Sequence, residues 1–383
     1  MKMRYLTRLN MLGSLAFISI LIALSLLYTS GNFHTVGNKL SLKGTGSTTS
    51  EVAEENQVND VPASPIPTDV DHRLVVFGDA WSAIGSRLAE QGQAWPEWLC
   101  SMWPCRLETY AQREHVCESS VCGSVVDETE LHTIVSDAAR SLESLPDLRS
   151  QIDQWLAAEL KATQTDTAGG DLKVRSNNTI FALSFLIWDI WKFNGVSMED
   201  TEKSMERSLD TIFQQLDRLA EYTDSNDLRI MLMMSIDPTF LPAFDPTRGQ
   251  KDMIDIVTEW NNNLKEKANY WESGSVYVFN TNEFLNNQIR SRQFYLAGML
   301  DGHGLGNQNP WDDVENPCVS SQGTWLPFLG NKDQRCENPE RFLFWDGLHL
   351  GPTANQMMAT EMFHDIENLW AKDSNSTEST EST

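Results

Sequence analysis

From about residue 71 onward, apolar and polar positions follow two alternating patterns. Short runs that are almost entirely apolar end in Gly, Asp or Asn, which is typical of strands buried on both faces. These runs are Leu74–Phe77, Thr179–Trp191, Leu228–Ile236 and Ser275–Asn280. The segments between them carry apolar residues three and four positions apart, as amphipathic helices do. The alternation predicts an α/β fold: a three-layer α/β/α sandwich around a mainly parallel sheet.

The expected helices differ in how clearly they are marked. Ser197–Thr223 has its apolar residues on one face, and Ser197 and Asp200 stand at capping-box spacing at its start. Further helical patterns run from about Trp81, over Glu130–Thr163 with a break near Pro146, over Met253–Leu264 and over Ala359–Trp370. Because ligands of such sheets bind at the carboxyl ends of the strands, we expect the functional site there.

The N-terminus has the pattern of a signal anchor. Basic residues within 1–10 precede an uncharged, mostly apolar run at 11–28, which spans roughly 27 Å as a helix, close to the thickness of a hydrocarbon core. We expect residues 1–10 in the cytosol and the remainder in the lumen or outside the cell. The alternative is a cleaved signal peptide and a secreted protein. Residues 29–70 are predicted to be a disordered stalk, 71–371 a folded domain and 372–383 a disordered Ser/Thr/Glu tail.

The net charge limits the possible binding partners, and the cysteines indicate the compartment. A net charge of −25 excludes nucleic acid and anionic membrane surfaces as binding partners, leaving the N-terminal helix as the predicted membrane contact.

The six cysteines form an even set, which predicts disulfides in the secretory pathway. We expect Cys318 to pair with Cys336, and pairing among Cys100, Cys105, Cys117 and Cys122. Their spacing does not match a zinc site, and no metal or cofactor is expected. Asn177 and Asn375 lie in glycosylation sequons.

Two distant segments carry the candidate chemistry. Gly78-Asp79-Ala80 follows the first strand, and Asp346 and His349, three residues apart, open the last predicted helix. They resemble the first and last sequence blocks of the SGNH (GDSL) hydrolases. A secreted fungal branch of that family is similar over about residues 71 to 371. The other segments in the expected order are Trp95-Pro96-Glu97-Trp98-Leu99-Cys100, Leu186-Ile187-Trp188-Asp189-Ile190-Trp191 and Asp237-Pro238-Thr239-Phe240-Leu241-Pro242.

The resemblance implies an esterase site with its nucleophile missing. In that family His349 would be the general base and Asp346 would orient it. Ala80 stands in place of the nucleophilic serine, and the glycine and asparagine of the oxyanion hole are missing from the blocks around residues 109–111 and 186–188. We therefore expect a catalytically impaired, membrane-anchored hydrolase-family protein that binds an acylated carbohydrate or lipid.

Two alternatives remain open. The first is an active carboxylic-ester hydrolase that attacks through Ser82 or through a water activated by His349; the other role of Ser82 would be to cap a helix. The second is a non-catalytic glycan-binding, lipid-binding or interaction protein. Four more residues are predicted at strand ends, where they would line the pocket or brace loops: Asp79, Trp188, Asp189 and Asp237.

Overall fold

A computed structural model describes residues 72–85, 91–117, 120–130, 146–165, 176, 178–193, 196–244, 250–302, 304, 306–319 and 335–378. The predicted cytosolic segment, apolar run and stalk (1–10, 11–28 and 29–70) lie outside these residues, as does Asn177. Among the helices that are described, none combines the length and the apolar character needed to cross a membrane.

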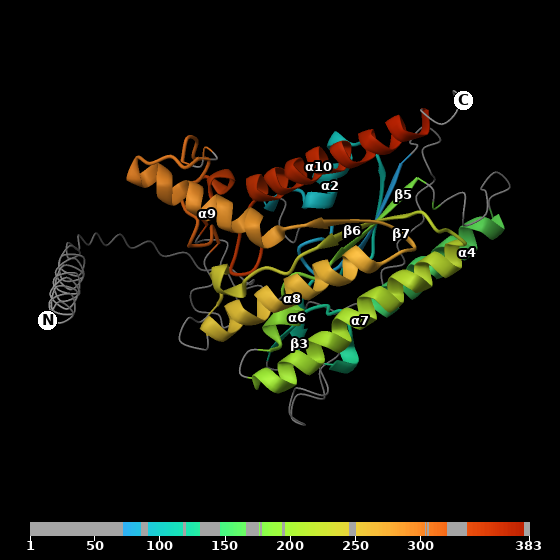
Figure 1. The fold of residues 1–383 in the computed structure, drawn as a ribbon. Helices are drawn as coiled ribbons and strands as arrows, with labels where there is room; N and C mark the ends of the chain where they lie inside the picture. Colours follow the sequence, from blue (N-terminus) through green and yellow to red (C-terminus); the bar gives the residue numbers. More distant parts are fainter. Residues whose placement is uncertain are drawn as a thin grey trace, which may run out of the picture. The chain divides into compact units, whose positions relative to one another are not determined.

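Five parallel strands form the central sheet (Figure 1). They are β1 (Arg73–Gly78), β2 (Arg106–Thr109), β5 (Thr179–Ser184), β6 (Leu228–Met233) and β7 (Gly274–Phe279). Their order is β2-β1-β5-β6-β7, so the chain first adds a strand on one side of β1 and then builds outward on the other. The winding direction reverses between β1 and β5, and in this topology a crevice opens there at the carboxyl edge.

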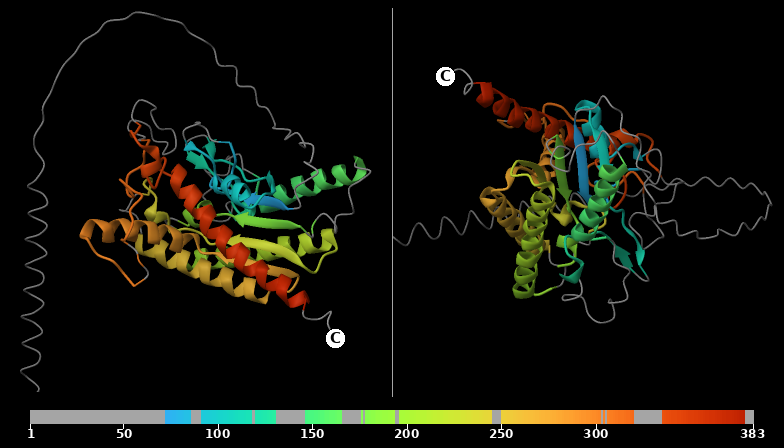
Figure 2. Two further views of the ribbon diagram at one scale, coloured as in Figure 1. Left: turned by 90° about the horizontal axis from the view of Figure 1, so that it is seen from above. Right: turned by 90° about the vertical axis from the view of Figure 1, so that its right-hand side faces the viewer.

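Helices cover both faces of the sheet (Figure 2). Successive residues of a strand point to opposite faces, so Leu74 and Val76 enter one apolar core and Val75 and Phe77 the other. The first core includes residues of α2 (Trp95–Met102), α9 (Thr281–Ala297) and α10 (Pro352–Glu378). The second includes residues of α4 (Leu148–Thr165), α7 (Met198–Thr223) and α8 (Gln250–Tyr270). These layers confirm the predicted α/β fold.

Smaller elements complete the described part of the chain. An antiparallel pair, β3 (His115–Cys117) and β4 (Ser120–Cys122), stands apart from the main sheet. Three short helices lie in loops: α6 (Trp188–Trp191), η3 (Pro238–Phe240) and η5 (Pro339–Arg341).

Two predicted elements near the carboxyl edge are wrong. The apolar run Thr179–Trp191 is a strand only to Ser184, where its neighbour β1 also ends, and the chain then turns into α6. The helix expected from Trp81 is not formed over the described residues 81–85, where the chain turns instead. The N–H groups of Trp81 and Ser82 both bond to Asp79, one to its carboxylate and one to its carbonyl oxygen, and this closes a tight turn.

The last helix also differs from its prediction at both ends. It begins at Pro352, so Asp346 and His349 lie in the loop before it rather than inside it. It continues to Glu378, into the segment 372–383 that was predicted to be a disordered tail. Once a helix is formed, each added residue gains a hydrogen bond without a new nucleation step, and so polar residues can extend it.

Other predictions are confirmed. Ser197 caps α7, its hydroxyl accepting the N–H of Asp200 at 3.2 Å. Disulfides join Cys100 to Cys105 and Cys318 to Cys336. Cys117 and Cys122 belong to β3 and β4, and Asn375 to the end of α10; the side chains of these three residues are outside the described part of the structure.

The end of β1 is held by a side chain as well as by backbone. Strand β2 ends at Thr109, opposite Val76, and just beyond it the N–H of Gln112 donates to the Gly78 carbonyl at 3.1 Å. The buried amide of Gln151 on α4 also bonds there: its Oε1 accepts the Gly78 N–H at 2.7 Å and its Nε2 donates to the Gly78 carbonyl at 3.0 Å. The backbone at the crevice is therefore bonded on both sides.

This close fit predicts that Gly78→Ala destabilises the fold. A Cβ at this position would stand 2.3 Å from the carbonyl oxygen of Ser184 on the adjacent strand. Overpacking of this kind costs about 1–3 kcal/mol, which urea unfolding would measure as a lower free energy of unfolding. Gly302→Ala is the matched control, because a Cβ there meets no atom within 4 Å. An equal loss in both variants would contradict the prediction.

Candidate functional site

Asp79 fastens the turn after β1 to the loop after β5. Its side chain is fully buried, and its carboxylate accepts backbone N–H groups from Trp81 at 3.2 Å, Leu186 at 2.8 Å and Ile187 at 3.1 Å. Burial raises the pKa of Asp79 to about 7, even though these three hydrogen bonds act to lower it. The three hydrogen bonds of its carboxylate are all with backbone N–H groups, so Asp79 is a brace between two loops.

A tight loop before α10 presents His349. Phe344 pairs with Leu350 across an isolated bridge, which closes the loop. Within it, one oxygen of Asp346 accepts the N–H groups of Leu348 at 2.8 Å and His349 at 2.9 Å. The Nδ1 atom of His349 lies 2.9 Å from both oxygens of the same carboxylate. Asp346 thus fixes the loop and the orientation of the imidazole together.

The two segments of the predicted site come together in space. The indole of Trp81 donates to the carbonyl of Leu348 at 2.7 Å, which joins the turn after β1 to the His349 loop. Ala80 and His349 line one small cavity, whose volume of ≈ 20 Å³ holds about one water molecule. Arg113 and Glu97 contribute polar groups to its wall.

The second ring nitrogen of His349 faces a glutamate. Its Nε2 lies 3.1 Å from Oε2 of Glu114, a residue in the segment that follows β2. Glu114 is 1% exposed and His349 4% exposed. The imidazole is therefore enclosed between two carboxylates, Asp346 on one nitrogen and Glu114 on the other.

This arrangement decides the charge of the imidazole. Burial alone would lower the pKa of His349, but the attraction of Asp346 and Glu114 and their hydrogen bonds outweigh it and raise the pKa to about 10. At neutral pH the ring is an imidazolium that donates from both nitrogens. Such a ring has no free lone pair, so it cannot accept a proton as a general base does.

Ser82 does not reach the cavity. Its hydroxyl is fully buried and accepts the indole N–H of Trp95 at 3.0 Å, away from His349. Because no helix begins at this turn, the alternative role of Ser82 as a helix cap is also wrong. Its hydroxyl instead holds α2 against the turn after β1.

The remaining predicted site residues also lie off the cavity wall. Trp188 packs directly on Gly123, where a Cβ would stand only 1.8 Å from the indole nitrogen. Asp189 is fully buried, which raises its pKa, and its carboxylate bonds to Val126 and Lys192.

Asp237 likewise braces a loop. Its carboxylate caps η3 by accepting the N–H of Thr239 at 2.9 Å, and its own N–H donates to the side chain of Asn282 at 2.8 Å. Partial burial raises the pKa of Asp237. With Asp79, Asp189 and Asp237 all bonded to neighbouring loops, loop bracing accounts for each of the three aspartates.

Glu114 is the residue that the sequence pattern did not reveal. The family resemblance points to a missing oxyanion-hole glycine in the segment after β2, whereas the charged group of that segment is the carboxylate of Glu114, a few residues further on. The place of Glu114 in the chain could have identified it, because a charged residue shortly after a parallel strand lies at the same sheet edge as Asp79. Strand β2 itself is short and half-exposed, which hid that signal.

Within the residues that the structure describes, no group of three or more His, Cys, Asp or Glu side chains is arranged to hold a metal ion. No protein-family model and no curated protein sequence matches this chain.

The charged state of His349 predicts a specific titration. In NMR spectra its ring should remain protonated at pH 8, and Glu114→Gln should lower its pKa because one of the two carboxylate partners is lost. The folded-state pKa exceeds the ordinary value of 6.5, so the resulting stabilisation is complete below about pH 6.5 and is lost as pH rises through about 10. A His349 ring that titrates near 6.5 in the unmodified protein would contradict this assignment.

Proposed function

We propose that this chain is an SGNH (GDSL) hydrolase-like protein that does not hydrolyse esters. The observation that carries the proposal is the His349 ring enclosed between Asp346 and Glu114, next to an alanine at the position of the nucleophile. The order of strand-end segments and the shared cavity of Ala80 and His349 support the family resemblance. The predicted anchor at residues 11–28 would place the folded domain on the lumenal or outer side of a membrane.

Ester hydrolysis by a triad requires a hydroxyl within hydrogen-bond reach of an unprotonated imidazole. Ala80 offers only a methyl group, and the nitrogen that would take the proton instead donates to Glu114. Loss of the nucleophile alone reduces kcat by roughly 10⁶ in a serine protease. Here both the nucleophile and the base are disabled, which supports a complete loss of the usual chemistry.

The contacts weigh against the alternative of an active esterase. Ser82 is buried and its oxygen is engaged by the Trp95 indole. A water in the cavity beside His349 would meet a ring nitrogen that donates a hydrogen bond and cannot remove a proton. The cavity has a volume of ≈ 20 Å³, room for about one water and far less than an acyl chain occupies. This small volume favours a role as an interaction protein over binding of a large acylated ligand at this cavity.

A fluorophosphonate probe that labels active serine hydrolases tests the proposal on the purified full-length chain. We expect no labelling of the unmodified protein. Ala80→Ser should also remain unlabelled, because Glu114 still holds the Nε2 atom of His349 and keeps the ring charged. The double variant Ala80→Ser/Glu114→Gln frees the base and should be labelled, with the rate rising as pH passes the lowered pKa of His349.

The control adds His349→Ala to the double variant and should abolish labelling, while circular dichroism verifies that every variant is folded. Labelling of the unmodified protein that disappears in Ser82→Ala would establish the active-esterase alternative and refute the proposal.

A further inference from the structure

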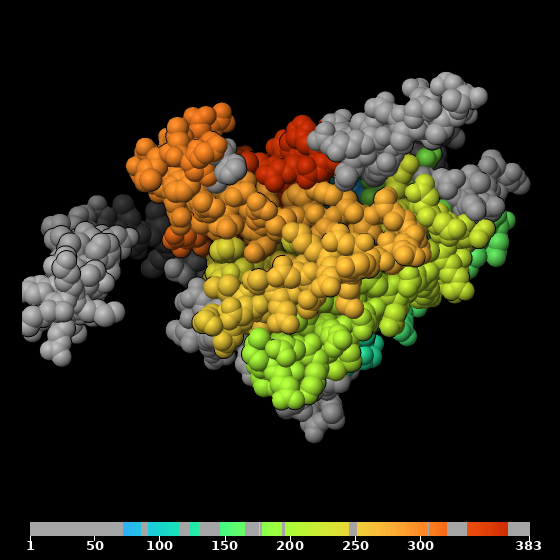
Figure 3. Space-filling view, viewed as in Figure 1, coloured from blue at the N-terminus to red at the C-terminus, as the bar shows by residue number. Residues whose placement is uncertain are grey.

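A second surface lies far from the His349 cavity, along the seam between α7 and α8 (Figure 3). The two helices run in the same direction, as two cross-links show. Lys267 of α8 bonds to Asp210 of α7 at 2.6 Å, and the indole of Trp271 bonds to Asp217 at 2.8 Å. These cross-links hold together two helices that cover the same face of the sheet.

The seam contains a groove of ≈ 700 Å³. Its apolar lining consists of Met205, Leu209 and Phe213 from α7, together with Tyr270 at the end of α8 and Trp271 directly after it. Met205 and Leu209 belong to the buried core, whereas Tyr270 is 77% exposed and forms an open wall. The volume falls within the range of established ligand pockets, and the floor is apolar.

The rim of the groove is acidic. Four glutamates line it: Glu202, Glu206, Glu259 and Glu266. Two lysines also line it, but Lys203 pairs with Glu199 and Lys267 with Asp210, both of which lie outside the groove lining. Both lysines are therefore paired with carboxylates outside the groove, and the four glutamates give the groove a negative charge.

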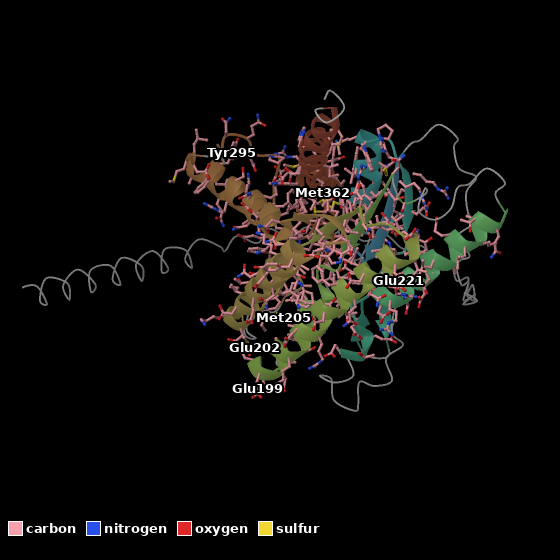
Figure 4. All side chains as sticks on the ribbon, turned by 45° about the vertical axis from the view of Figure 1, so that its right-hand side comes forward. Glu199, Glu202, Met205, Glu221, Tyr295 and Met362 are labelled. Atoms are coloured by element: carbon pink, nitrogen blue, oxygen red, sulfur yellow. A yellow bond between two sulfur atoms is a disulfide. The ribbon has the colours of Figure 1, made fainter. Side chains whose placement is uncertain are left out.

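Both helices contribute glutamates to the groove. Glu202 and Glu206 line it from α7, and Glu259 and Glu266 line it from α8. From residue 202 to 213 the groove extends roughly 17 Å, about three helical turns. Figure 4 shows Glu202 and Met205 close together at the beginning of α7, with Glu221 near its other end.

We propose that this groove binds a cationic amphipathic helix of a partner protein. An apolar stripe of about three turns would lie on the floor between α7 and α8, and flanking Lys or Arg side chains would pair with the glutamates of the rim. Apolar anchors in a groove between helices are a recurring mode of helix recognition. The rim selects for positive charge, since an acidic or neutral helix would leave four glutamates facing it without compensation.

Fluorescence anisotropy with a labelled synthetic peptide tests this proposal on the full-length chain. The probe is an 18-residue peptide of Leu and Lys with Leu at helical spacing on one face. We expect saturable one-to-one binding that weakens as NaCl is raised, because salt screens the rim. A scrambled peptide of the same composition and a Leu/Glu peptide should bind at least about tenfold more weakly.

Matched variants locate the site. Glu202→Gln/Glu259→Gln should weaken peptide binding by about tenfold, and Tyr270→Ser by about fivefold. The controls are Glu221→Gln/Glu340→Gln, which makes the same change in net charge outside the groove, and Tyr295→Ser, an exposed tyrosine of α9 (Figure 4). Both controls should leave the affinity unchanged, and thermal melting verifies the fold of each variant.

Equal binding of the scrambled peptide would reduce the interaction to non-specific electrostatics and overturn the proposal. Equal losses in the groove and control variants would do the same. Because none of these substitutions touches the His349 cavity, the result is independent of whether that site hydrolyses esters.

Discussion

The buried ion group around His349 is the constraint on which the carboxyl edge of the sheet depends. The His349 ring there pairs with two carboxylates, Asp346 from the loop before α10 and Glu114 from the segment after β2. Removing one member of a buried ion pair leaves an uncompensated charge and costs about 3–5 kcal/mol. The group therefore ties together two segments that share no strand pairing, and it holds the histidine in a state unsuited to proton abstraction.

The other polar groups at this edge are also bonded to neighbouring parts of the protein. Asp79 binds three backbone N–H groups, Ser82 accepts the indole of Trp95, and Gln151 completes the bonding of Gly78. Asp79, Ser82, Gln151 and His349 are each bonded to other groups of the protein. The polar groups at this edge therefore hold the loops together. The open, acidic groove lies elsewhere, on the seam between α7 and α8.

The sequence predicted the strands that are buried on both faces. It did not predict an edge strand or a helix with few buried residues. Strands β1, β5 and β6 are buried on both faces and read as continuous apolar runs. Strand β2 lies at the edge, mixes Arg, Leu, Glu and Thr, and has no such run. Helix α9 was also missed, because only a few of its residues are buried and its apolar face is weak. The end of β5 at Ser184 could not be predicted, since it is set by the length of its neighbour and by the bonds that Asp79 makes to Leu186 and Ile187.

By itself the sequence determined the α/β layering and the absence of a hydroxyl at residue 80, because apolar periodicity and side-chain identity are local properties. The pairing of Cys318 with Cys336 was an expectation that the structure confirms. The state of His349 was decided only by the tertiary structure. Its partner Glu114 is 235 residues away in the chain, and no local pattern connects the two. The groove has the same origin: its glutamates read as ordinary solvent-facing residues of two separate helices, and only the packing of α7 beside α8 joins them around one apolar floor.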